Sequence, residues 1–189
     1  MPTFNVLIAT TGRPTLQKML DSLSPQLEKD DCLTIVYDGH NEVPKFNIDD
    51  FKCKVVCYFE PEALGYWGHG IRNKYASLLE NKDFVMHADD DDMYSKDSFK
   101  ELRAYCDDVN KLYIAKMTIG DLIFPPDNTI QRGAIGTPCG IIPLSLNKKV
   151  IWGEYYSGDF AVYDLLAKIS EPIFLDIVMY ITRPHWYNL

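Results

Sequence analysis

Four consecutive aspartates, Asp89 to Asp92, follow a short apolar segment at residues 84–88. The apolar segment is typical of a buried strand, so the carboxylates come where that strand ends. Four adjacent carboxylates repel one another unless a positive charge lies among them. Hard divalent cations such as Mg²⁺ and Mn²⁺ prefer carboxylate oxygens and often share their remaining positions with substrate phosphates. The sequence therefore predicts a metal-bridged phosphate or nucleotide-diphosphate site at this strand end.

An acidic turn is the other interpretation of these four residues, because an aspartate can cap a helix that follows it closely. Asp92 is assigned that role, since a helix is predicted to begin shortly after it. Asp91 is predicted to bind the metal, and Asp89 or Asp90 to share the metal or to bind a ribose. The apolar strand favours the metal site, because a solvated turn does not need a buried strand directed at it.

Polar turns close the first two predicted strands as well. Thr10, Thr11 and Arg13 follow the first strand, and their hydroxyl groups, turn amides and guanidinium could hold a nucleotide base or a phosphate. Asp38 follows the second strand and could accept a hydrogen bond from a base, with Tyr37 stacking nearby. Both segments are equally compatible with ordinary turn chemistry, so a ligand-binding role is a hypothesis for each of them.

A glycine-containing loop at residues 65–70 precedes a predicted helix at residues 71–79. Glycine lets a backbone approach a ligand closely, and the aromatic residues of the loop could pack on a sugar or a base. Arg72 lies early in the helix, where it could reach a phosphate or brace the aspartates. The alternative is that Arg72 serves only as a structural counter-ion.

Asp159 is predicted to lie at the N-terminus of a later helix. A carboxylate in that position is stabilised by the helix dipole and can act as a cap. The functional interpretation is a general base that takes a proton from an attacking hydroxyl group, with Glu154 as the competing candidate. His185, close to Arg183, is a candidate ligand for a metal or a diphosphate.

Hydrophobic periodicity predicts the elements that must position these residues. Strands are expected at residues 5–10, 32–37, 54–59, 84–88, 112–117, 121–124 and 173–181. Helices are expected at residues 16–27, 71–79, 95–106 with Ser95 as N-cap, in a short stretch opened by Pro143, and at 159–169, with loops at 133–140 and 152–158. This order is typical of an α/β sheet with right-handed crossovers, in which ligands bind at the strand ends.

Length and composition limit the classes of function. A chain of 189 residues fits one domain, with a nucleotide-binding half expected at about residues 1–94 and an acceptor half at about residues 95–189. The net charge of −8 disfavours nucleic-acid binding. No apolar run reaches the roughly 18 residues of a membrane span, and the start lacks the basic region of a signal peptide. The five scattered cysteines argue against a disulfide framework and favour a cytoplasmic location.

Six motifs in this order resemble those of the inverting glycosyltransferases of the GT-A fold, family 2-like. The motifs are Thr10-Thr11-Gly12-Arg13-Pro14, Tyr37-Asp38-Gly39, Gly70-Ile71-Arg72-Asn73, Asp89-Asp90-Asp91-Asp92, Gly158-Asp159 and Arg183-Pro184-His185. The resemblance covers nearly the whole chain and implies a mostly parallel central sheet flanked by helices. The small size also resembles the compact GT-A domains encoded by large algal DNA viruses, which can be one module of a longer polypeptide. That resemblance would place a viral protein in the host cytoplasm.

The resemblance implies a nucleotide-sugar donor, most often a UDP-sugar such as UDP-glucose, and a glycan or other hydroxyl acceptor. Thr10, Arg13 and Asp38 would hold the nucleoside, Asp89 the ribose or the metal, and Asp91 a Mn²⁺ or Mg²⁺ ion that bridges the diphosphate. Arg72 or His185 could also stabilise the diphosphate. Asp159 would deprotonate the acceptor, which attacks with inversion; it is the sole base implied, because the motif here is Gly-Asp where the family has Glu-Asp. Trp67, Trp152, Tyr155 and Tyr156 are candidates for sugar stacking, with core packing as the equal alternative for each.

Two other classes of function compete with this prediction. A sugar nucleotidyltransferase shares an α/β nucleotide site but carries a glycine-rich loop with Lys or Arg after its first strand, whereas residues 10–14 contain one glycine. A non-enzymatic module that binds Ca²⁺ or sugars would show affinity for them but no dependence on a nucleotide.

Overall fold

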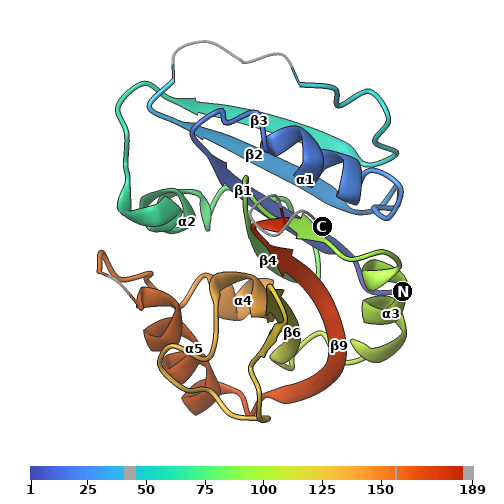
Figure 1. Cartoon of the computed structure of the whole chain (residues 1–189), viewed down its shortest axis with the longest axis vertical. Helices are drawn as coiled ribbons and strands as arrows, with labels where there is room; N and C mark the ends of the chain where they lie inside the picture. Colours follow the sequence, from blue (N-terminus) through green and yellow to red (C-terminus); the bar gives the residue numbers. More distant parts are fainter. Residues whose placement is uncertain (41–45, 156, 185–189) are drawn as a thin grey trace.

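The computed structural model describes residues 1–40, 46–155 and 157–184 of the chain. Four parallel strands form its first half, in the order β3-β2-β1-β4 (Figure 1). Their bounds are Phe4–Thr10 for β1, Cys32–Asp38 for β2, Lys54–Glu60 for β3 and Phe84–Asp89 for β4. Because the strands are parallel, their carboxyl ends meet at one edge of the sheet.

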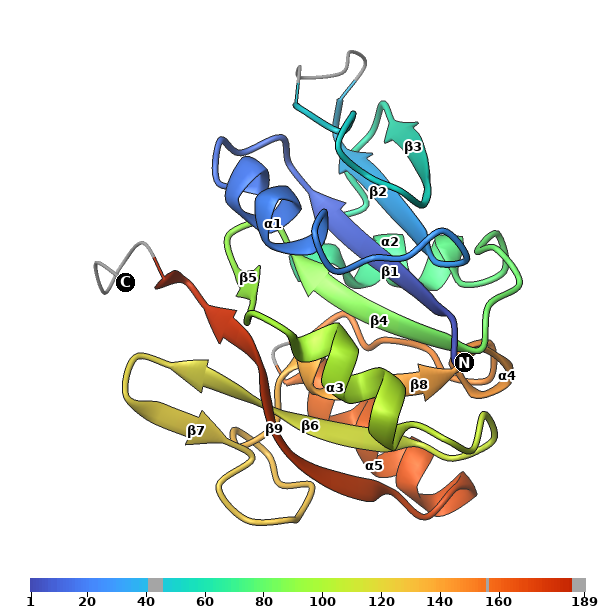
Figure 2. The same ribbon diagram turned by 90° about the vertical axis from the view of Figure 1, so that its right-hand side faces the viewer.

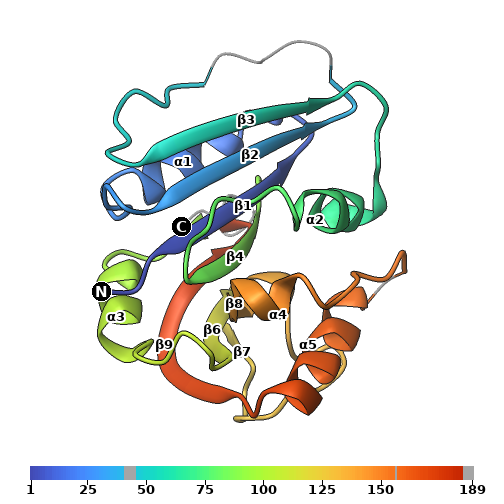
Figure 3. The same cartoon turned by 180° about the vertical axis from the view of Figure 1, so that it is seen from behind.

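Helices cover both faces of this parallel half. Helix α1 (Leu16–Leu23) lies on one face and α2 (His69–Tyr75) on the other, as comparison of Figures 1 and 3 shows. Strand β1 is buried along its whole length, and its side chains alternate between the two faces. Ile8 belongs to the core cluster that includes Leu20 of α1, whereas Leu7 belongs to the cluster that includes Ile71 of α2. Burial on both faces explains the continuous apolar runs of these strands.

The second half extends the sheet and curls it. It contains β5 (Met93–Tyr94), α3 (Ser98–Tyr105), β6 (Tyr113–Ile119), β7 (Leu122–Phe124), β8 (Gly140–Pro143), α4 (Leu144–Asn147), α5 (Gly158–Ile169) and β9 (Ile173–Thr182). Strand β8 joins the halves by pairing antiparallel with both β4 and β6. Strand β9 runs parallel to β6 and bends until its end pairs with β5 (Figure 2). The end of β9 therefore lies beside the end of β4, where the Asp89 amide donates to the Tyr180 hydroxyl at 3.0 Å.

Three segments differ from the sequence prediction, and one of them is the two-residue strand β5, which was not predicted. The loop predicted at residues 133–140 instead contains a short 3₁₀ helix, Thr137–Cys139, and leads into the buried strand β8. Four residues are too few to show a strand periodicity, so β8 escaped prediction. The helix predicted from Ser95 begins at Ser98, preceded by Asp97. Ser95 is not its N-cap, because its hydroxyl donates to the Val178 carbonyl of β9 at 2.5 Å.

The remaining elements follow the predicted order. Strand β6 extends two residues beyond its predicted end, α1 ends at Leu23 and α2 at Tyr75, each four residues before the predicted end. All five cysteines are free thiols. In the part of the chain that the structure describes, no helix has the length and apolar character needed to cross a membrane.

Candidate functional site

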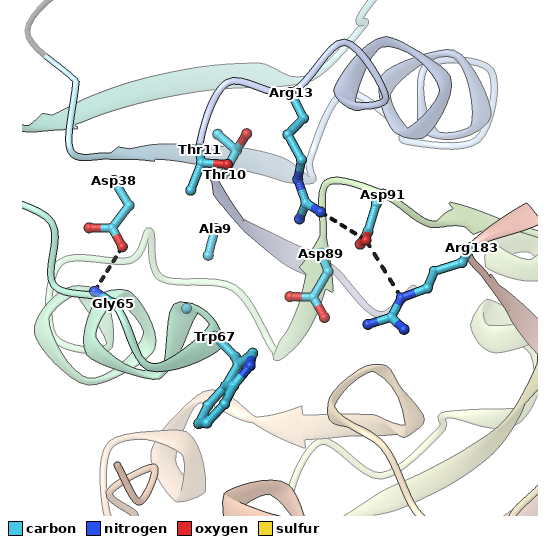
Figure 4. A pocket seen from close by; sticks show the side chains of 11 residues that line it. Ala9, Thr10, Thr11, Arg13, Asp38, Gly65, Trp67, Asp89, Asp91 and Arg183 are labelled. Atoms are coloured by element: carbon cyan, nitrogen blue, oxygen red, sulfur yellow. Dashed lines mark hydrogen bonds and ion pairs between the residues drawn. The ribbon is translucent and has the colours of Figure 1, made fainter. Parts of the chain in front are cut away.

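A pocket of about 240 Å³ opens at the carboxyl edge of the parallel strands (Figure 4). Its lining includes six of the predicted site residues, which come from the ends of β1, β2 and β4: Thr10, Thr11, Arg13, Asp38, Asp89 and Asp91. Residues of the loop after β3 and Arg183 after β9 complete the wall. The sheet thus gathers segments more than 170 residues apart around one cavity.

The three aspartates Asp89, Asp90 and Asp91, at the end of β4 and in the turn that follows it, differ in their surroundings. Asp89 Oδ1 accepts a hydrogen bond from Arg72 Nη2 at 2.5 Å, and Asp91 Oδ2 accepts one from Arg13 Nη1 at 2.9 Å. Both carboxylates line the pocket. Asp90 between them is fully buried and lies against the turn after β1. The chain turns at Asp90 and Asp91, so that Asp89 and Asp91 line the pocket while Asp90 is buried, and Arg13 contacts both Asp90 and Asp91.

Asp90 holds the turn after β1 and does not line the pocket. Its carboxylate accepts from the Thr10 hydroxyl at 2.5 Å and from the Thr11 amide at 3.2 Å, and it forms an ion pair with Arg13. The prediction that Asp90 itself binds a ribose or a metal does not fit this geometry. A buried carboxylate bonded to the turn instead fixes the position of Thr10, Thr11 and Arg13 around the pocket.

Asp92 ties the end of β9 to the acidic turn. Its Oδ1 accepts a hydrogen bond from the Arg183 amide at 2.8 Å, so the prediction that Asp92 caps the following helix is wrong. Burial, with the negative charges of Asp89 and Asp91 added, raises the pKa of Asp92 to about 8. The side chain of Arg183 returns over the pocket, where its Nε lies 3.6 Å from Asp91 Oδ2.

Two carboxylates and two arginines suit a site shared between a cation and phosphate groups. Each of Asp89 and Asp91 contacts an arginine through one oxygen, and each lines the pocket. Mg²⁺ commonly needs only one or two carboxylates when substrate phosphates and water supply the other ligands. Among the described residues no cluster of three or more His, Cys, Asp or Glu side chains could hold a metal. His185, the third predicted metal ligand, lies outside the described residues.

Asp38 fixes the loop that forms the opposite wall of the pocket. Its two carboxylate oxygens accept from the Leu64 amide at 2.6 Å and the Gly65 amide at 2.9 Å. Each oxygen retains a lone pair, so Asp38 can still accept from a ligand in the pocket. Tyr37 cannot stack on that ligand, contrary to prediction, because it is buried and stacks on Phe59 at 5.0 Å between ring centroids.

The loop after β3 presents Trp67 to the pocket in a constrained backbone conformation. Trp67 is 67% exposed and lines the pocket, with a φ of 54°. The left-handed region costs a residue with a Cβ about 1–2 kcal/mol. Gly68, at φ +81°, approaches β1 so closely that a Cβ would lie 2.7 Å from the Ala9 Cβ. Strain of this kind is found at ligand-binding segments, and here it turns an indole toward the cavity.

Arg72 braces the site from behind. Its side chain is 1% exposed and contacts three groups: Asp89, the Trp67 carbonyl at 2.7 Å and the ring of Trp152 at 5.3 Å. Arg72 therefore matches the counter-ion interpretation and does not line the pocket. Trp152 is 2% exposed and belongs to the core, so it cannot stack on a sugar. Tyr155 is exposed, and Tyr156 lies outside the described residues.

Asp159 lies in the first turn of α5 and apart from the lining of the pocket. Its Oδ1 accepts from the Phe160 amide at 2.8 Å. Burial raises the pKa of Asp159, and the hydrogen bond from the Phe160 amide and the positive charge of Arg72 partly oppose that shift. A carboxylate whose pKa is raised by burial is suited to proton abstraction. Glu154, the competing candidate, is exposed on the loop before α5.

Comparisons with known proteins give a structural likeness alone. No family model and no curated protein sequence matches the chain. S. aureus TarS 1–349 in complex with UDP superposes with a TM-score of 0.73 at 15% identity, over 96% of this chain and 60% of that chain. Its complex with UDP-GlcNAc gives a TM-score of 0.69 at 16% identity, over 96% and 58%. A Bacillus anthracis protein provisionally named glucose-1-phosphate thymidylyltransferase gives a TM-score of 0.54 at 10% identity, over 94% and 87%.

The chain has a GT-A fold. The likeness and the mixed α/β sheet confirm the predicted fold class. Within this GT-A chain the first four strands are parallel and β8 pairs antiparallel with its neighbours. The chain spans between 36% and 62% of the length of the TarS chains that it matches.

Arg183 lines the pocket of this GT-A chain but was not predicted to do so, although it belongs to the motif Arg183-Pro184-His185. Arg183 follows a strand that was predicted to end near residue 181, and no neighbouring strand was predicted for it. Only the bend of β9 toward β5 brings Arg183 to Asp91. Its position therefore depends on the curl of the sheet, which no local pattern encodes.

Proposed function

We propose that this protein is a glycosyltransferase that moves a sugar from a nucleotide-sugar donor to an acceptor hydroxyl group. The observation that carries the proposal is the pocket in which Asp89, Asp91 and two arginines face an exposed tryptophan. Such a lining can hold an anionic diphosphate at one end and an aromatic or sugar ring at the other. The TarS structures with UDP and UDP-GlcNAc support a UDP-sugar as the donor, because the same fold holds those ligands there.

Different residues of the pocket would contact different parts of the donor. Asp38, Thr10 and Thr11 would contact the nucleoside where β1 and β2 end, with Trp67 packing against a ring of the ligand. Arg13 and Arg183, both of which contact Asp91, would bind the diphosphate oxygens. These two cations lie on opposite sides of Asp91 in Figure 4, so they can clamp the diphosphate between them.

Mn²⁺ or Mg²⁺ is the cofactor that fits this arrangement. Asp91 would bind it directly, Asp89 would share it or bind the ribose, and His185 remains a proposed third ligand. When bound, the ion would neutralise the charge that develops on the departing diphosphate. Arg13 and Arg183, which contact Asp91 here, can then turn to the phosphate oxygens, whereas Arg72 stays behind Asp89 as its buried counter-ion.

Asp159 is the proposed general base. A partly buried carboxylate with a raised pKa would take the proton of the acceptor hydroxyl. Attack on the anomeric carbon from the face opposite the diphosphate would give inversion. Glu154 is the weaker candidate, because its carboxylate is exposed and water is not excluded from it during the proton transfer.

Hydrolysis of the donor tests the enzymatic part of this proposal. The protein is incubated with UDP-glucose, UDP-galactose and UDP-GlcNAc in turn, with Mn²⁺, and release of UDP is measured. At least one donor should be hydrolysed, and Asp159→Asn should lower the rate at least about a hundredfold, the scale of general-base catalysis. Asp164→Asn, which removes an exposed carboxylate of the same helix paired with Lys168, is the matched control and should keep the rate. Equal rates for Asp159→Asn and Asp164→Asn would show that Asp159 is not the base.

A sugar nucleotidyltransferase is the second candidate, because the B. anthracis structure named above shares the fold over 94% of this chain. Such an enzyme would join a sugar 1-phosphate to a nucleoside triphosphate and release pyrophosphate. Incubation with glucose 1-phosphate and UTP or dTTP distinguishes the two activities. Pyrophosphate release from these substrates, without hydrolysis of any UDP-sugar, would replace the first proposal by the second.

A further inference from the structure

One face of α2 carries three polar side chains that all contact the same short segment. His69, Arg72 and Asn73 are spaced i, i+3 and i+4, so they project from one side of the helix. His69 Nδ1 forms a hydrogen bond of 2.6 Å with the Gly153 carbonyl oxygen, and the guanidinium group of Arg72 lies over the ring of Trp152. The segment at Trp152–Gly153 is thus bonded to α2 by side chains of three residues.

Asn73 makes the most complete of these contacts. Its Nδ2 donates to the Trp152 carbonyl at 2.9 Å, and its Oδ1 accepts from the Trp152 amide at 2.7 Å. One carboxamide therefore satisfies both backbone groups of a residue 79 positions later in the chain. Among the residues of the described chain that line the pocket, Asn73 is absent, so it has no direct access to a bound donor.

The bonded segment leads directly to α5 and its first-turn carboxylate. Gly158, the first residue of α5, packs so closely that a Cβ would lie 2.7 Å from His69 Cε1 and 2.7 Å from the Gly153 carbonyl oxygen. Figures 1 and 3 show the segment before α5 passing beside α2. The place of Asp159, one residue further on, is therefore set by the surface of α2.

The same helix also reaches the pocket. Arg72 donates to Asp89, which lines the pocket, and to the carbonyl of Trp67, which forms its wall. Helix α2 thus contacts the donor pocket through Arg72 and the Trp152–Gly153 segment through Asn73 and His69. A shift of that segment away from α2 would move Asp159 relative to the pocket while leaving the pocket itself in place.

We propose that Asn73 is a positioning residue that, by bonding both backbone groups of Trp152, holds Asp159 at its working distance from the donor. This inference rests on the proposed function, because it assigns Asp159 the role of base. Displacement of a catalytic group by about 1 Å can lower a rate about a hundredfold. Loss of Asn73 should therefore lower turnover while donor affinity stays the same.

Three measurements on Asn73→Ala test the proposal. The first is kcat for hydrolysis of the UDP-sugar that the wild type hydrolyses fastest. The second is the Kd of UDP by calorimetry, and the third is hydrogen exchange at Trp152 and in the first turn of α5. Gln26→Ala is the matched control, since the Gln26 carboxamide also donates to a backbone carbonyl, that of Ser95, and accepts from a backbone amide, that of Phe99. If Asn73→Ala does not fold, Asn73→Ser takes its place.

Asn73→Ala should lower kcat at least about tenfold, change the Kd of UDP less than about twofold, and speed exchange at Trp152 and in the first turn of α5. Gln26→Ala should keep kcat within about twofold. An unchanged kcat, a Kd weakened in proportion to kcat, or an equal loss in Gln26→Ala would overturn the proposal. Failure of the wild type to bind UDP or to hydrolyse any donor would instead refute the proposed function, and exchange at Trp152 would still show whether Asn73 holds the segment.

Discussion

Trp67 combines an exposed indole with a backbone that a residue with a Cβ adopts at a cost. If its ring packs on the nucleotide, Trp67→Ala and Trp67→Gly should weaken UDP binding equally, by about tenfold, since stacking on an aromatic side chain is worth about 1–3 kcal/mol. The two variants should differ in stability. Glycine tolerates positive φ, so Trp67→Gly should be more stable than Trp67→Ala by about 1 kcal/mol, or roughly 2–4 °C in Tm.

Calorimetry and thermal unfolding of the two variants check both statements. If either variant bound UDP with wild-type affinity, Trp67 would not contact the nucleotide. An alanine variant as stable as the glycine variant would show that the loop relaxes out of the left-handed conformation once the indole is absent.

The raised pKa of Asp159 has a consequence for the pH dependence of the reaction. Burial stabilises the protonated form, so a larger fraction of the enzyme carries a protonated base at a given acidic pH than for an exposed aspartate. A general base works only when deprotonated. The acid limb of kcat/KM should therefore fall at a pKa above the ordinary aspartate value of about 3.9. A pH profile of donor hydrolysis measures it, and an acid limb at or below pH 4 would contradict the assignment.

Among the elements, the close approach of the α2 N-terminus to β1 decides the shape of the pocket. Gly68→Ala would place a Cβ 2.7 Å from Ala9 in addition to straining the backbone at φ +81°. Gly133→Ala is the matched control, because Gly133 also has positive φ, at +78°, but has open space around its Cβ position.

Gly133→Ala should lower the free energy of unfolding only by the cost of the left-handed backbone, about 1–2 kcal/mol, and the variant should keep its affinity for UDP. Gly68→Ala should lose more stability and bind UDP more weakly, since the loop must move away from β1. Denaturant unfolding and UDP titration of both variants make the comparison. Equal losses of stability with intact UDP binding would mean that the contact with Ala9 is not a constraint on the pocket.

Strand β8 is bonded through its first residue to α5, which follows it in the chain. The fully buried Tyr163 of α5 accepts a hydrogen bond from the Gly140 amide at 3.0 Å through its hydroxyl group. Tyr163→Phe leaves that amide without its partner, which should cost about 1–3 kcal/mol of stability. UDP binding should not change, because neither residue lines the pocket. Thermal unfolding of the variant tests this contact, and a Tm equal to that of the wild type would show that water replaces the hydroxyl group.

At the scale of the whole molecule, the parallel half was predictable because its signals are local. Continuous apolar runs mark strands buried on both faces, and polar residues at their ends fall at one edge of the sheet. Thr10, Asp38, Asp89 and Asp91 therefore line the pocket as the sequence indicated. Asp90 is buried because the chain turns after β4, and the sequence alone does not say which of the four aspartates faces inward.

The second half was less predictable because its contacts are distant in sequence. Strand β8 has four residues and is defined by pairing with β4 and β6, not by its own pattern. Arg183 reaches the pocket only because β9 bends to β5. The sequence predicts Ser95 as an ordinary N-cap, but for the same reason its hydroxyl group donates to a backbone carbonyl of β9. Tertiary pairing thus overrides local preference where the sheet curls.

Titration of UDP into the protein by calorimetry, with and without Mn²⁺, tests the central claim most directly. Asp91→Asn is compared with the wild type, and Asp176→Asn, which changes a 93% exposed carboxylate outside the pocket, is the control. The account predicts UDP binding that is stronger with Mn²⁺, loses this dependence in Asp91→Asn, and is unchanged in Asp176→Asn. Absence of UDP binding both with and without Mn²⁺, or an equal response to Mn²⁺ in Asp91→Asn, would contradict the metal-bridged nucleotide site.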